Sequence, residues 1–83
     1  MSRRDLLHVL TALAELAGDQ AGVPVEVAAI DARIGRGRSD MRTPLNLASL
    51  AADGLVEQVA GGRWAATPAG IERHREDEDY AGR

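Results

Sequence analysis

Four arginines lie close together near the middle of this 83-residue chain: Arg33, Arg36, Arg38 and Arg42. They fall within ten residues, and Asp40 is the one acidic residue among them. A guanidinium group binds phosphate oxygens through paired hydrogen bonds, and phosphate contacts provide most of the sequence-independent affinity for nucleic acid. The cluster therefore indicates a phosphate-binding surface. The competing interpretation is a solvated loop, or one whose arginines pair with the acidic C-terminal tail.

Two side chains at the end of this cluster have the groups that recognise base edges. Arg42 has the fork that matches guanine, and the amide of Asn46 matches adenine. Such groups read bases when they project from the first turns of a helix. We therefore expect Arg42 and Asn46 to lie near the beginning of one.

The composition excludes several classes of protein. There are 13 acidic residues against 10 arginines and no lysine, so the net charge is −3. The absence of cysteine excludes disulfides and thiolate metal sites. The longest apolar run is far shorter than the ~20 residues of a membrane helix, and the N-terminus does not resemble a signal peptide, which favours a cytoplasmic location.

Catalysis is not indicated by any motif in the sequence. His8 and His74 are far apart and lack the spacing of metal ligands, so we expect surface histidines. No nucleophile with a base, carboxylate pair or phosphate loop is recognisable. We expect neither a catalytic residue nor a cofactor nor a metal, and no enzymatic activity.

Apolar residues at helical spacing predict the first two helices. The first begins near Arg3, ends before Gly18 and has an apolar face formed by Leu6, Leu10, Leu13 and Ala17, with Val9 and Leu16 beside them. The second runs over residues 26–34 and ends at Gly35, and its apolar face is formed by Val27, Ile30 and Ile34.

The beginning of the third helix has two possible positions. Ser39 is one candidate cap, but Pro44 would then lie one turn inside the helix, where it removes a hydrogen bond. Thr43 is the other candidate, with Pro44 at the first helical position, and we favour it. Leu47, Leu50 and Ala51 then face the core, and the helix ends at Gly54.

A β-hairpin and a fourth helix follow. The predicted strands cover residues 55–60 and 63–66, with a turn at Gly61-Gly62. Residues 22–25 contain Pro24 and are expected to form an edge strand or a turn, and in a winged helix a short strand at this place pairs with the hairpin. Trp64 is expected to cover the small core. A helix beginning at Thr67-Pro68 completes one domain, residues 1–75. Residues 76–83 form an acidic tail that we expect to fray, to cover the arginines, or to contact a second subunit.

This order of elements resembles the winged helix-turn-helix domains of MarR-type and PadR-type transcriptional regulators. The resemblance rests on Leu47, Leu50, Gly54, Leu55, Val56, Trp64, Thr67, Pro68 and Gly70, with residues 27–35 as the first helix of the motif. It covers roughly residues 23–75. It implies a mainly α fold of the α+β class, with a three-helix core, a short β-hairpin wing and a C-terminal helix.

The resemblance also implies a function. Such regulators bind duplex DNA as homodimers, with one helix in the major groove and the wing on the neighbouring backbone. Together with the arginine cluster, this predicts seven DNA-binding residues: Arg36, Arg38, Arg42, Thr43, Asn46, Ser49 and Arg63. The alternative is a winged-helix module that binds proteins within a larger assembly, which the net acidity and the alanine-rich third helix favour.

Overall fold

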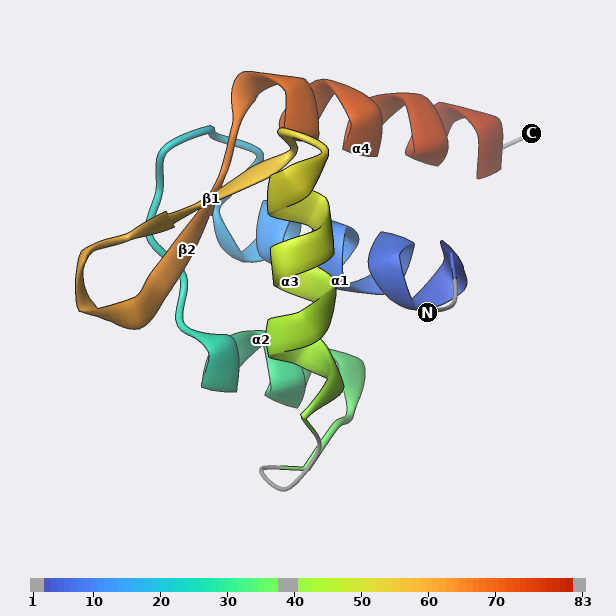
Figure 1. The fold of residues 1–83 in the computed structure, drawn as a ribbon. Coiled ribbons are helices and arrows are strands. Elements are labelled where there is room, and N and C mark those ends of the chain that lie inside the picture. The colour runs from blue at the N-terminus through green and yellow to red at the C-terminus, as the bar shows by residue number, and fades with distance from the viewer. Residues whose placement is uncertain (1–2, 38–40, 82–83) are drawn as a thin grey trace.

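The computed structural model describes residues 3–37 and 41–81, with side chains as far as residue 77. The described residues form four α-helices and one two-stranded antiparallel sheet (Figure 1). The elements in chain order are α1 (Arg3–Leu16), α2 (Val27–Ile34), α3 (Arg42–Ala52), β1 (Val56–Val59), a 3-10 turn (Ala60–Gly62), β2 (Arg63–Ala66) and α4 (Pro68–Ala81). The predicted mainly α fold of the α+β class is confirmed at this level.

Helix α1 is the central element, because it contacts all three other helices and β2. Its predicted core residues Val9, Leu10 and Leu13 are buried, and they pack with residues from each of the other helices: Ile30, Leu47, Leu50 and Ile71. Leu16 does not belong to this core and is 38% exposed. It is the last residue of α1, and the next residue, Ala17, is buried in the core.

Helix α3 begins earlier than the sequence predicted. It starts at Arg42 with Met41 as the flanking residue, and no side chain caps it. Pro44 is therefore its third residue, a position where the missing N–H has no helical partner to lose. Thr43 is not the cap because its hydroxyl turns into the interior. The alternative cap, Ser39, lies outside the described residues.

The hairpin has the predicted position and pairs with the segment before α2. Val56 lies opposite Ala66 and Val59 opposite Arg63, and the turn between the strands passes through Gly61 at φ 76°. Glycine adopts this left-handed conformation without strain. The Val25 N–H donates to the Trp64 carbonyl at 2.8 Å, and the Trp64 N–H donates to the Val25 carbonyl at 2.9 Å. The predicted edge pairing is thereby confirmed.

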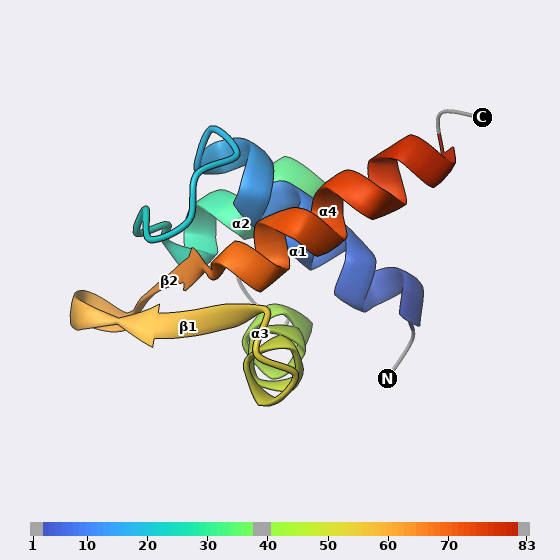
Figure 2. The ribbon, with the colours of Figure 1, turned by 90° about the horizontal axis from the view of Figure 1, so that it is seen from above.

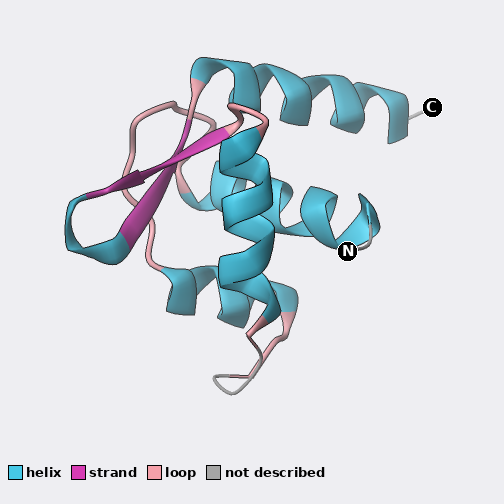
Figure 3. Cartoon of the chain, viewed as in Figure 1, coloured by secondary structure: helices cyan, strands magenta, loops and turns pink. Residues whose placement is uncertain are grey.

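Helix α4 is longer than expected and buries a histidine. Its backbone is helical to Ala81, so residues 76–81, which we expected to fray, continue the helix (Figure 3). The prediction of a surface histidine is wrong for His74, which is 3% exposed and has Nε2 3.5 Å from an Asp19 carboxylate oxygen. His8 is exposed, as expected. Within the described residues, no helix combines the length and the apolar character needed to cross a membrane.

Candidate functional site

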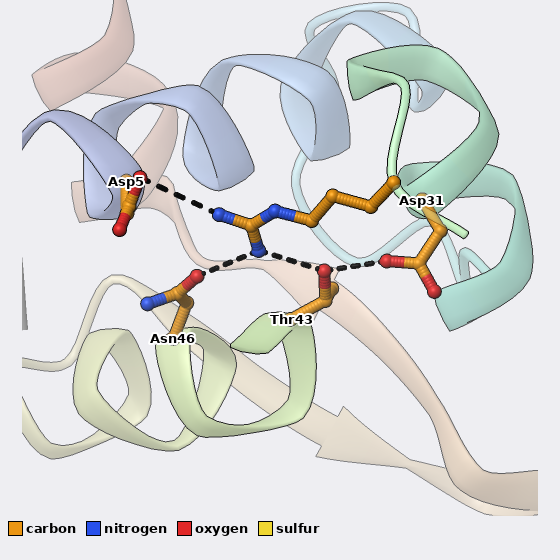
Figure 4. A network of polar contacts seen from close by, with 5 residues as sticks. Asp5, Asp31, Thr43 and Asn46 are labelled. Carbon is orange, nitrogen blue, oxygen red and sulfur yellow. Dashed lines mark hydrogen bonds and ion pairs between the residues drawn. The ribbon is translucent and has the colours of Figure 1, made fainter. Parts of the chain in front are cut away.

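A network of polar side chains joins α1, α2 and α3 at the place where α2 meets α3. At its centre is Arg36, two residues after the end of α2, whose side chain is only 6% exposed. One nitrogen, Nη1, donates to Thr43 Oγ1 at 2.9 Å and to Asn46 Oδ1 at 2.8 Å. The other, Nη2, lies 3.6 Å from a carboxylate oxygen of Asp5 in α1 (Figure 4).

Asp31 of α2 completes this network. Its carboxylate accepts a short hydrogen bond from the Thr43 hydroxyl, so Thr43 links a carboxylate to the guanidinium. Asp31, Thr43 and Asn46 are 9%, 0% and 1% exposed. Buried polar groups stabilise a fold only when they are paired, and these groups pair with one another. The network therefore sets the position of α3 relative to α1 and α2.

Three of the seven predicted DNA-binding residues belong to this network: Arg36, Thr43 and Asn46. The prediction that they face outward is wrong, because their hydrogen-bonding groups are directed at one another inside the protein. Arg33, also from the arginine cluster, has its Nε 3.3 Å from Glu15 Oε1 of α1. Arg33 and Arg36 of the arginine cluster thus make contacts within the chain.

The other predicted residues lie elsewhere. Arg42 and Arg63 are exposed, Ser49 is partly buried, and Arg38 lies outside the described residues. The guanidinium of Arg63 lies over the hairpin turn, where a Cβ added to Gly61 would meet its Nε at 3.4 Å. Helix α3, with Arg42 in its first turn, and the hairpin lie along the same side of the molecule (Figure 2).

The outward face of α3 is apolar. Met41 and Leu45 are 67% and 58% exposed, and Ala48 and Ala52 are also exposed. The spacing of these four residues places them on one side of the helix, and we call them the outer stripe. The sequence interpretation missed the outer stripe, although this helical spacing is visible in the sequence. It also missed Asp5 and Asp31, whose acidic side chains gave no signal of an inward orientation.

The search for a metal site and the comparison with known proteins gave the following results. Among the described residues, no group of three or more His, Asp or Glu side chains is placed to hold a metal ion. Comparison of the chain with protein-family models, with curated proteins and with solved structures found no match.

Proposed function

We propose that this chain is a winged helix-turn-helix regulator that binds duplex DNA in the cytoplasm, with α2 and α3 as the helix-turn-helix and β1 and β2 as the wing. One observation supports this most directly. Helix α3 and the hairpin lie along one side of the molecule, with Arg42 in the first turn of α3 and Arg63 at the hairpin turn, both exposed (Figure 2). In this arrangement the helix can enter the major groove of DNA while the wing contacts the neighbouring sugar-phosphate backbone.

The DNA-binding residues of this proposal are fewer than the sequence predicted. In this proposal Arg42 and Arg63 contact phosphates, and Ser49 belongs to the same helix as Arg42. Arg38, which lies outside the described residues, remains a proposed DNA-binding residue on its charge alone. The network of Arg36, Thr43 and Asn46 holds α3 in position and does not contact DNA. Two copies occupy two half-sites of one operator.

The test is binding to a fluorescent duplex of random sequence, measured by anisotropy at several salt concentrations. Each phosphate contact contributes about −0.9 to the slope of log K against log salt. The variant R42A/R63A is therefore expected to reduce the magnitude of that slope by about 1.8 and to weaken binding at low salt.

The matched control is R73A/R75A, which removes the same charge from exposed positions on α4. It is expected to leave the slope nearly unchanged. If both variants reduced the salt slope equally, only the overall charge of the protein would matter for binding. The assignment of the DNA-binding surface to α3 and the hairpin would then be wrong. Absence of binding by the unaltered protein at low salt would refute the proposal.

A second candidate function is protein binding through α3. The exposed Met41 and Leu45 favour it, because large apolar side chains grouped on one helix face are more typical of protein contacts than of a phosphate-binding surface. If the DNA measurement fails, this candidate becomes the principal one.

A further inference from the structure

The outer stripe (Met41, Leu45, Ala48 and Ala52) has an arrangement that is complementary to itself. Of its two large residues, Met41 directly precedes α3 and Leu45 lies in the N-terminal half of the helix, whereas its two small residues lie in the C-terminal half. In the single chain, Met41 and Leu45 remain 67% and 58% exposed. Covering them removes apolar surface from water, which is favourable.

A two-fold axis that pairs α3 with α3 of a second copy, antiparallel, matches large residues with small ones. With the axis between residues 46 and 47, Met41 lies opposite Ala52 of the second copy and Leu45 opposite its Ala48. Each large side chain then fills the space above an alanine. A parallel pairing would place Leu45 against Leu45 and Ala48 against Ala48, which leaves gaps. Two-fold symmetry makes every such contact occur twice.

The charges beside the outer stripe fit the same arrangement. Arg42 and Asp53 are both exposed, lie at opposite ends of α3, and their spacing places them on the same flank of the stripe. In the antiparallel pair, Arg42 of each copy comes beside Asp53 of the other. This complementarity favours a second copy of the chain over a partner of unrelated sequence.

We propose that the outer stripe is a self-association surface on which a second copy of this chain docks with α3 antiparallel to α3, and that this dimer keeps α3 away from DNA. The self-association is independent of DNA, whereas the masking of α3 rests on the proposed function. Four side chains form a patch much smaller than the roughly 800 Å² per partner of a stable interface. The dimer is therefore weak and dissociates on dilution.

The first experiment is sedimentation equilibrium without DNA, over a wide range of protein concentration. The variant M41Q/L45Q keeps the charge and the helix propensity and is expected to weaken self-association at least about tenfold. The control is L16Q, which alters an exposed leucine away from α3 and is expected to have no effect. A protein that stays monomeric at every concentration, or equal effects of the two variants, would overturn the proposal.

The second experiment tests the direction of pairing and exploits the absence of cysteine from the chain. A mixture of M41C and A52C chains is expected to be joined by a short thiol cross-linker. Chains carrying M41C alone are expected not to be joined, because two such residues would lie about 16 Å apart along the helices. Efficient cross-linking of M41C alone would refute the antiparallel register.

The cross-linked dimer then tests the masking of α3. It is expected to bind the random duplex at least about tenfold more weakly than the same chains before cross-linking. Equal binding would refute the masking and leave the self-association standing. If the chains bind no DNA before cross-linking, the proposed function fails, while the sedimentation and cross-linking results still decide the self-association.

Discussion

Replacing Arg36 by methionine is expected to destabilise the fold strongly, although arginine is commonly a surface residue. The change keeps an apolar stem but removes the donors to Thr43 Oγ1 and Asn46 Oδ1. Asn46 is 1% exposed, so its carbonyl would lose its guanidinium partner without gaining water. An unsatisfied buried acceptor costs about 1–3 kcal/mol. The lost contact with the more exposed Asp5 adds up to about 1 kcal/mol.

The expected loss is therefore about 1–4 kcal/mol in the free energy of unfolding, measured by urea denaturation followed by circular dichroism. The control is R33M, because Arg33 forms an exposed ion pair with Glu15 and its loss is expected to cost less than about 1 kcal/mol. The double variant R36M/N46L removes both partners of one bond and is expected to be more stable than R36M. Equal stability of R36M and R33M would refute the structural role of Arg36.

Two further predictions concern the contacts that hold α4. Thr67→Ala is expected to destabilise the protein by about 1–2 kcal/mol in urea denaturation, because the Thr67 hydroxyl accepts from the Gly70 N–H at 3.0 Å and donates to the Gly54 carbonyl at 2.7 Å. Thr67→Ser keeps both bonds and should retain most of the stability. Gly70→Ala is expected to lower the thermal midpoint by more than Thr67→Ala does, because its Cβ would lie 1.9 Å from the Leu55 carbonyl oxygen. An unchanged midpoint in Gly70→Ala would contradict the close packing of α4 on this segment.

Local signals in the sequence predicted most of the elements. The end of α2 at Gly35 and the hairpin turn at Gly61 depend on glycine, whose conformational freedom acts within a few residues. The core face of α1 follows from helical spacing, because a helix next to a core buries residues three and four apart. Such features need no knowledge of the distant chain.

The candidate site was harder to predict because the direction of a polar side chain depends on tertiary contacts. Asn46 was predicted to read a base and Thr43 to contact DNA at the start of a helix, yet both are buried where Arg36 and Asp31 supply their partners. The sequence separation of these partners is 7 to 12 residues. Periodicity alone cannot show that an arginine folds back into the interior.

At its N-terminal end, α3 buries polar side chains and exposes apolar ones, which is the reverse of the usual arrangement. This reversal connects the buried network with the outer stripe. Thr43 and Asn46 occupy inward positions, so the neighbouring apolar Met41 and Leu45 are left facing solvent. The inward polar groups are satisfied within one chain, whereas the outward apolar groups gain stability only from something that covers them. Loss of Arg36 would remove the reason for the inward orientation of Asn46. The outer stripe therefore depends on Arg36, and R36M should impair self-association as well as stability.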